Sequence, residues 1–369
     1  RIYLPNSRGN IFDEIIPESI ITDSVGNLVS QEYRRITNQE FGTYLGFERN
    51  FFGEILKANA TLRLDKNENF DYLVSPAASL VYNIDAKHTV RGSIGRAIRN
   101  PTLQDQYLRY DVGRAVLLGN INGYDSLVTI ESFDFYRSQT TPLRENLTFF
   151  NLDPIEPERV TTVEIGYRGS WFKRFFVDAN AYYSWYTNFI GFQFGLDPSF
   201  SSAFPDRVTG VQAYRIAANA RDLVTTLGVN VGLNYYINDH LTATGNYSYN
   251  RLNQENDINP IVPAFNTPEN KYNLGINGRA YKIFKKRNHT QGFAVTYKWV
   301  EGFTFEGSPQ FSGFIESYGL VDAQVTYAFP KEKLTLKLGA SNLLNNEVFQ
   351  VYGGPRVGRL AYFSVTFEL

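Results

Sequence analysis

The chain has 369 residues, a net charge of -1, no cysteine and a mean hydropathy of -0.30. The balanced charge lacks the basic field of a nucleic-acid binder, the absence of cysteine excludes disulfides and thiolate metal sites, and no run of about 18 apolar residues offers a transmembrane helix. Aromatic residues reach 15%, which is typical of chains whose rings sit at membrane interfaces.

Segments of alternating apolar and polar residues follow one another along the chain. In residues 55–65 the apolar side chains share one face and the polar ones the other, and residues 175–188 repeat this pattern. The polar faces carry charges and amides, which suit a water-filled lumen, whereas the apolar faces suit lipid. About thirteen such strands are predicted, at residues 40–49, 55–65, 72–84, 88–96, 160–168, 175–188, 223–237, 241–252, 270–281, 292–300, 318–329, 334–341 and 359–369.

Short polar connections alternate with long ones between these strands. This alternation is typical of an antiparallel transmembrane β-barrel, with tight turns on the periplasmic side and loops outside. It predicts a large extracellular loop at residues 97–159 and an extracellular lead at residues 1–35. No linker divides residues 1–369, so we expect one all-β domain. Bacterial single-chain barrels have even strand counts, so either the chain is a portion of a barrel or a further strand lies within residues 1–35 or 97–159.

Six motifs in residues 73–369 carry a family resemblance. They are SPAASLVY at 75–82, GRAIRNPT at 95–102, LDPIEPER at 152–159 with EIGY at 164–167, AYYSWYTNFI at 181–190, NTPENKYNL at 266–274 and ASNLLN at 340–345. In this order they resemble the TonB-dependent receptors of Gram-negative outer membranes, especially those of the Bacteroidetes type. The resemblance implies a barrel of about 22 strands. Residues 1–369 would be its C-terminal portion, without about nine strands, the plug domain and the energy-coupling segment.

The same resemblance implies a function and a set of partners. The function is energy-coupled uptake of a scarce nutrient, such as a siderophore, cofactor, glycan or peptide, across the outer membrane of a Gram-negative bacterium. The implied partners are the N-terminal barrel strands and plug domain, a TonB-type energy-coupling complex, and outer-membrane lipid with lipopolysaccharide. An alternative stays open, in which the barrel is a structural component of a larger surface or secretion assembly with a lipoprotein partner. Neither interpretation includes an enzyme, a cofactor or nucleic acid.

Arginines and tyrosines gather in the first part of the 97–159 loop. Guanidinium groups bind carboxylates or phosphates and tyrosines stack on ligands, so these residues are candidate ligand contacts. In the alternative interpretation, the arginines near the strand end bind loop backbone, the plug or lipopolysaccharide. Aromatic residues further along predict that the loop folds, as a cap over the barrel mouth. The ligand-binding candidates are Arg99, Asp105, Tyr107, Arg109 and Tyr110.

Two further sets of residues follow from the strand faces. Trp185 and Trp299 fall near the outer ends of apolar faces and Trp171 falls at a short turn, so all three are expected to anchor the membrane interface. Charged and amide side chains on the polar faces are expected to line the lumen and bind the plug. These are Lys57, Arg63, Arg91, Glu164, Asp178, Asn180, Arg279 and Lys337.

Catalytic and metal sites are not predicted. His88, His240 and His289 all fall at short turns on the predicted periplasmic side, away from an external substrate. Residues 65–71 place oxygen side chains at alternate positions, as a calcium loop does. Phe70 stands where such a loop needs glycine and Pro76 where it needs glutamate, so a polar hairpin turn is expected instead.

Overall fold

The computed structural model describes residues 2–3, 17–22, 28–33, 38–221, 223–254, 261–263, 265–282, 288–307 and 312–368. Its largest element is an antiparallel sheet whose long strands follow in chain order. They are β4 (Asn38–Phe51), β5 (Leu56–Asn67), β6 (Phe70–Asn83), β7 (His88–Arg99), β12 (Glu158–Trp171), β13 (Phe175–Thr187), β16 (Val224–Tyr236), β17 (Leu241–Gln254), β19 (Asn270–Tyr281), β20 (Thr290–Val300), β23 (Tyr318–Phe329), β24 (Leu334–Ser341) and β27 (Leu360–Phe367).

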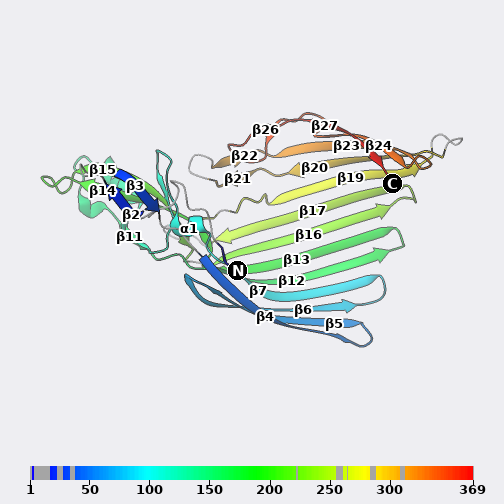
Figure 1. The fold of residues 1–369 in the computed structure, drawn as a ribbon, viewed down its shortest axis with the longest axis horizontal. Coiled ribbons are helices and arrows are strands. Elements are labelled where there is room, and N and C mark those ends of the chain that lie inside the picture. The colour runs from blue at the N-terminus through cyan, green and yellow to red at the C-terminus, as the bar shows by residue number, and fades with distance from the viewer. Residues whose placement is uncertain are drawn as a thin grey trace.

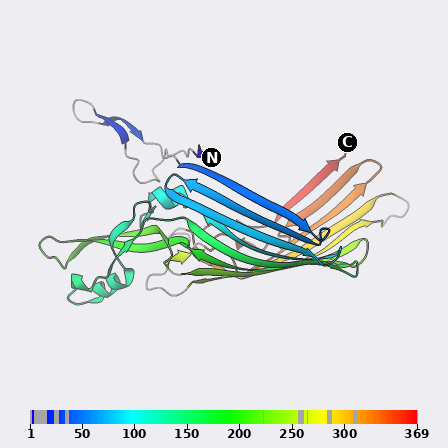
Figure 2. The ribbon, with the colours of Figure 1, turned by 90° about the horizontal axis from the view of Figure 1, so that it is seen from below.

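The sheet is curved and open. Figure 2 shows it bent into a trough, with β4 along one rim and β27 along the other. The two residues of β1 (Ile2–Tyr3) pair with the start of β4 and bring the sheet to 14 strands. β2 (Pro17–Thr22) and β3 (Leu28–Tyr33) form a separate hairpin in the predicted lead, and the remainder of that lead is outside the described residues. Within the described ranges, every helix is too short or too polar to cross a membrane.

All thirteen predicted strands form, and most are longer than expected. The largest change is at the predicted 97–159 loop. There β7 continues to Arg99 and β12 begins at Glu158, and these two residues face each other across the ladder. The connection therefore covers residues 100–157. It begins at Asn100 and Pro101, where proline, which has no N–H to donate, ends the pairing.

The register places the predicted lumen residues on one face of the sheet. Residues paired across antiparallel strands point to the same side. Arg91 faces Gly166 and Gly166 faces Asn180, so the polar positions of β7, β12 and β13 coincide. On the opposite face, Ile94 and Ile165 are 52% and 61% exposed. Extended exposure of large apolar side chains is expected where a face contacts lipid.

The two ends of the sheet differ in their connections, as predicted. One end, called here the short-turn end, carries residues 52–55, 84–87, 172–174, 237–240, 282–289 and 330–333. The other, called the long-connection end, carries residues 100–157, 188–223, 255–269, 301–317 and 342–359, together with the tight turn at residues 68–69. Two small hairpins lie in the last two long connections: β21 (Phe303–Phe305) with β22 (Gly313–Ile315), and β25 (Val348–Phe349) with β26 (Arg356–Val357).

Residues 100–157 and 188–223 fold together at the long-connection end and are called the loop assembly. Figure 1 shows it projecting beyond the ends of the long strands. Its central hairpin is β14 (Ile190–Phe200) and β15 (Val208–Asn219). β10 (Tyr124–Val128) pairs with β14, β11 (Phe149–Leu152) pairs with β10, β9 (Val116–Leu118) runs parallel to β15, and β8 (Arg109–Asp111) pairs with β9. β18 (Val262–Pro263) also pairs with β14, and the helices are α1 (Leu103–Tyr107), α2 (Ile130–Ser138) and η1 (Arg144–Asn146).

The loop assembly contains most of the largest buried apolar cluster, including Leu118, Leu127, Leu152 and Ile216. A second cluster joins Phe133 and Tyr136 of α2 to partly buried side chains of the β14–β15 hairpin. The aromatic segment predicted to fold therefore does fold, and its partner is this hairpin. No strand was predicted from the sequence between residues 188 and 223, so β14 and β15 were missed.

Candidate functional site

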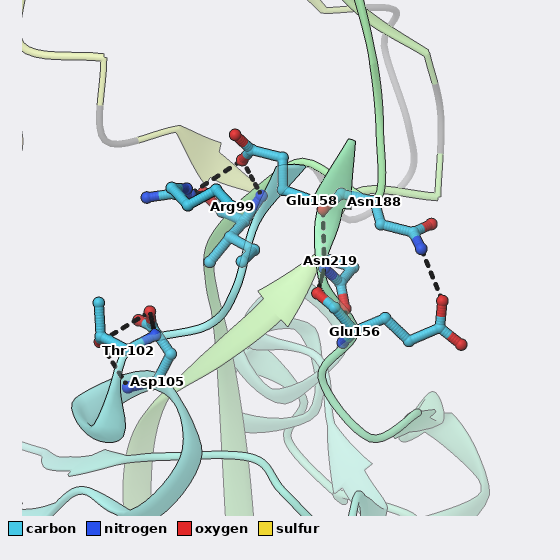
Figure 3. Close-up of polar contacts among 8 residues, drawn as sticks. Arg99, Thr102, Asp105, Glu156, Glu158, Asn188 and Asn219 are labelled. Atoms are coloured by element: carbon cyan, nitrogen blue, oxygen red, sulfur yellow. Dashed lines mark hydrogen bonds and ion pairs between the residues drawn. The ribbon is translucent and has the colours of Figure 1, made fainter. Parts of the chain in front are cut away.

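A buried carboxylate joins the loop assembly to the sheet. The Glu158 side chain is 8% exposed, and its Oε2 accepts hydrogen bonds from Arg99 Nη2 at 2.9 Å and from the backbone N–H of Ile190 at 2.9 Å. The end of β7, the start of β12 and the start of β14 thus meet at one oxygen atom. Figure 3 shows the Arg99 and Glu158 side chains of this contact. Arg99 Nη2 also donates to the backbone carbonyl oxygen of Ile190 at 3.4 Å, so this arginine contacts loop backbone as well as Glu158.

Three further residues close the base of the loop assembly. The Asn219 Nδ2 group donates to the carbonyl oxygens of Glu156 at 3.0 Å and Asn188 at 2.8 Å, while Asn219 Oδ1 accepts from the Glu156 N–H at 2.7 Å. Asn188 Nδ2 donates to Glu156 Oε2 at 2.6 Å (Figure 3). One amide side chain thus satisfies backbone groups from both connections, which holds the two segments together.

Asp105 has a local structural role in α1. Its carboxylate accepts hydrogen bonds from the N–H and the Oγ1 of Thr102, both at 2.8 Å, and Thr102 Oγ1 accepts from the Asp105 N–H at 3.1 Å. This reciprocal arrangement is a capping box, which satisfies backbone donors at a helix start (Figure 3). Tyr107 follows at the end of α1, and its hydroxyl accepts from Asn69 Nδ2 at 2.9 Å, which fastens α1 to the β5–β6 turn.

The structure separates the five predicted ligand contacts. Asp105 and Tyr110 line a cavity of about 400 Å³ in the loop assembly, called here the Arg215 cavity. Tyr107 lines a neighbouring cavity of about 360 Å³. Arg99 lies at the base of the assembly, and Arg109 lies on β8 outside both linings. The Arg215 cavity is lined by Gln104, Asp105, Leu108, Tyr110, Leu117, Leu118, Phe192, Arg215, Ala217 and Gly307.

Four of the predicted lumen residues form one polar cluster on β7, β12 and β13. Arg91 Nη2 lies 3.3 Å from Asp178 Oδ1, and Arg91 Nε lies 3.9 Å from Glu164 Oε1. Asn180 Nδ2 donates to Glu164 Oε1 at 2.9 Å. Arg168, which the sequence analysis did not single out, lies 3.8 Å from Asp178 Oδ2. Two cations and two anions thus balance on the polar face.

The other four predicted lumen residues lie apart from this cluster. Lys57 pairs with Glu48 of the neighbouring strand at 2.8 Å, and Arg63 pairs with Asp65 of its own strand at 2.8 Å. Arg279 lies in an irregularity of β19 between the paired residues Gly278 and Tyr281, where its N–H donates to the carbonyl of His240 at 2.8 Å. Lys337 lies on β24 opposite Thr326 and Ser364.

Aromatic pairs mark the ends of the apolar face. Trp185 contacts Tyr183 with ring centroids 4.8 Å apart, and Trp299 stacks on Tyr272 at 5.3 Å, both toward the long-connection end. Trp171, at the short-turn end, contacts His88 with ring centroids 4.8 Å apart.

The three histidines contact aromatic residues at the short-turn end. His88 and His289 hydrogen-bond tyrosine hydroxyls, and His240 packs on Tyr281. Among the described residues, no three His, Asp or Glu side chains are grouped closely enough to hold a metal ion.

The comparison with known families agrees with this architecture. The family model described as "TonB dependent receptor-like, beta-barrel" matches residues 5–343. The chain belongs to this family. TonB-dependent receptors are outer-membrane β-barrels of Gram-negative bacteria, and the family is one of receptors and transporters. The all-β fold and the family are thus as the sequence predicted, while the Bacteroidetes type stays a prediction. No curated protein matches the chain.

Solved receptors share the fold. A variant of the ferric enterobactin receptor of Pseudomonas aeruginosa in complex with enterobactin aligns with a TM-score of 0.64 and 16% identity, covering 91% of this chain and 46% of that one. The copper transporter OprC gives 0.62 and 13%, covering 91% and 49%. The siderophore receptor PirA of Acinetobacter baumannii gives 0.59 and 14%, covering 90% and 46%. The chain therefore spans just under half the length of these receptors, and the likeness concerns the fold.

Proposed function

We propose that this chain forms part of the barrel wall of a TonB-dependent receptor that takes up a scarce nutrient across the outer membrane. The observation that carries the proposal is the division of thirteen long strands into a charged face and an exposed apolar face, within a chain that the family model matches. The open rims at β4 and β27 would pair with N-terminal strands of the same barrel, because unpaired strand edges are not stable in lipid.

The orientation follows from the two ends of the sheet. In outer-membrane barrels the turns are short on the periplasmic side and the loops are long outside. The loop assembly, and with it most of residues 97–159, would then face the exterior together with the lead at residues 1–35. The tryptophans at residues 171, 185 and 299 would lie at the two membrane interfaces, near outer-membrane lipid and lipopolysaccharide. A TonB-type complex would supply the energy from the periplasmic side.

Uptake is tested by growth of a strain that lacks the receptor gene. The similar solved structures are named as siderophore, iron and copper receptors, so we expect slower growth when ferric chelates limit the medium, with rescue by the wild-type gene. Glycan-limited and peptide-limited media are the parallel arms. A growth defect only on glycans or only on peptides would instead identify that class as the ligand. Normal growth in all three media would overturn the proposal.

Replacing Arg91 or Asp178 by alanine is expected to loosen a plug held by the polar face. Each substitution leaves the polar cluster with an unbalanced charge, because Arg91 contacts both Glu164 and Asp178. We expect higher sensitivity to an antibiotic too large for ordinary porins, measured as its minimum inhibitory concentration. Lys173→Ala, which removes an exposed cation from a short turn and leaves the polar face unchanged, is the matched control. Unchanged exclusion in both Arg91→Ala and Asp178→Ala strains would contradict plug contact at this cluster.

A second candidate function is a scaffold in a larger surface assembly with a lipoprotein partner. Exposed aromatic side chains on the loop assembly favour it, since Phe135 on α2 is 54% exposed and Phe204 at the hairpin tip is 63% exposed. Purification in mild detergent separates the two functions. A lipoprotein that stays bound in equal amount, and whose loss leaves growth on limiting nutrients unchanged, would favour the scaffold.

A further inference from the structure

We propose that the Arg215 cavity binds an organic carboxylate, with the acidic group on the Arg215 guanidinium and an apolar, ring-sized body along the leucine side chains. This assigns a ligand class to the exterior of the receptor and rests on the proposed uptake function only for its biological purpose. Binding itself is a property of the cavity and is tested separately.

Arg215 is a buried cation with few partners. It lies on β15 and is 7% exposed. Its Nη2 donates to the carbonyl oxygen of Gly307 at 2.8 Å, and its Cζ lies 3.4 Å from the centre of the Phe192 ring. Arg215 takes part in none of the ion pairs among the described residues, although the charge of Glu306 lies nearby. A guanidinium has five N–H donors, so its capacity exceeds the single acceptor that it meets here.

The charge on Arg215 persists despite its burial. Desolvation lowers the pKa of Arg215 to about 10, opposed by the nearby charge of Glu306, so the group is still protonated at neutral pH. A buried charge is costly unless it is paired and hydrogen-bonded. The Phe192 ring offsets part of this cost through its electron-rich face. An anion that enters the cavity would supply the missing acceptors, and a carboxylate matches the planar fork of the guanidinium in two hydrogen bonds.

The remaining walls indicate what the anion is attached to. Leu108, Leu117 and Leu118 give the cavity an apolar side, and Tyr110 adds a hydroxyl. Asp105 also contributes to the lining, but its carboxylate is engaged by Thr102, and its negative charge disfavours a second acidic group at that side. A volume of about 400 Å³ lies within the range of small-ligand sites. A ligand with one acidic group at Arg215 and an uncharged ring beside the leucines would therefore be complementary to this lining.

Benzoate and its uncharged analogue benzamide test the proposal on the detergent-purified receptor. Ligand-observed NMR titration is expected to show benzoate binding to the wild type. Arg215→Met keeps the length of the side chain without its charge, and we expect it to raise the benzoate Kd roughly 10- to 100-fold while the benzamide Kd stays the same. Arg215→Lys should fall between the two. Arg221→Met is the matched control, because Arg221 also donates to a backbone carbonyl of the loop assembly but is exposed.

Three results would overturn the proposal. They are no benzoate binding by the wild type, an equal loss of benzoate and benzamide binding in Arg215→Met, or an equal effect of Arg221→Met. If Arg215→Met fails to fold, hydrogen exchange on the wild type decides. Benzoate should protect amides in residues 104–118 and 215–217, and protection only elsewhere would overturn the site. If the receptor binds benzoate at Arg215 but the strain without its gene grows normally, the ligand site stands and the proposed uptake function is wrong.

Discussion

Replacing Glu158 by alanine is expected to detach the base of the loop assembly while the long strands stay assembled. The buried N–H of Ile190 would lose its acceptor, and Arg99 would lose its ion pair. Because Arg99 is half exposed, water replaces much of its ion pair with Glu158. Most of the loss of stability therefore comes from the unsatisfied N–H of Ile190. Together the losses are expected to cost about 2–4 kcal/mol of local stability. Hydrogen exchange of residues 190–219 and protease cleavage within residues 100–157 measure this opening.

The matched control for this experiment is Glu156→Ala. Among the described residues its carboxylate binds the half-buried Asn188 side chain, while its backbone contacts with Asn219 remain in the variant. We expect faster cleavage and exchange in Glu158→Ala and near wild-type values in Glu156→Ala. Equal protection in both variants would show that the loop assembly is held by its apolar core alone, without help from the buried carboxylate.

The long strands could be predicted from the sequence because their signal is local. An alternation of apolar and polar side chains is set by the geometry of each strand alone, and in this chain it matches two different solvents, lipid and water. The predicted first and last residues of β19, β23 and β24 agree with those in the structure. Errors occur where the ladder continues past the alternation, as at Arg99 and Glu158, whose pairing depends on a strand far along the chain.

The β14–β15 hairpin carried a signal that was not used. Ile190, Phe192, Phe194 and Leu196 alternate with small or polar residues, as a strand requires. Glycines within the segment and the Asp-Pro sequence near its end weaken its strand propensity. Propensity alone therefore predicts a loop at this position. The hairpin is stabilised instead by β9 and β10 from another connection, so its packing partners could not be known from its own residues.

The Arg215 cavity was even harder to predict from the sequence than the β14–β15 hairpin. Gly307, which accepts from Arg215, is 92 residues away along the chain, and Phe192 comes from the opposite strand of the hairpin. No spacing rule joins three connections of a barrel, because their relative placement follows from the tertiary fold. Asp105 and Tyr110 were predicted to contact ligand from composition, and the structure does place both in the lining. Arg109 and Tyr107, equally suited by composition, lie outside it.

Arginine in place of Ile165 is expected to prevent stable insertion of the barrel. Ile165 lies at the middle of β12 on the apolar face, where it is 61% exposed. An arginine facing lipid near the bilayer midplane costs about 2–4 kcal/mol, because its charge must be drawn toward a distant interface or be hydrated within the membrane. The amount of receptor folded in purified outer membranes should therefore fall, and its unfolding midpoint in urea should decrease.

Ser93→Arg places the same charge at the same depth on the other face. Ser93 lies directly opposite Glu164 on the neighbouring strand, so the new guanidinium would meet a carboxylate in a polar environment. Folding of this variant is expected to remain close to wild type. If Ile165→Arg and Ser93→Arg behave alike, the two faces do not contact different solvents, and the strands cannot form a wall between lipid and lumen. A large effect of Ile165→Arg alone would place lipid on the apolar face and the polar cluster inside the barrel.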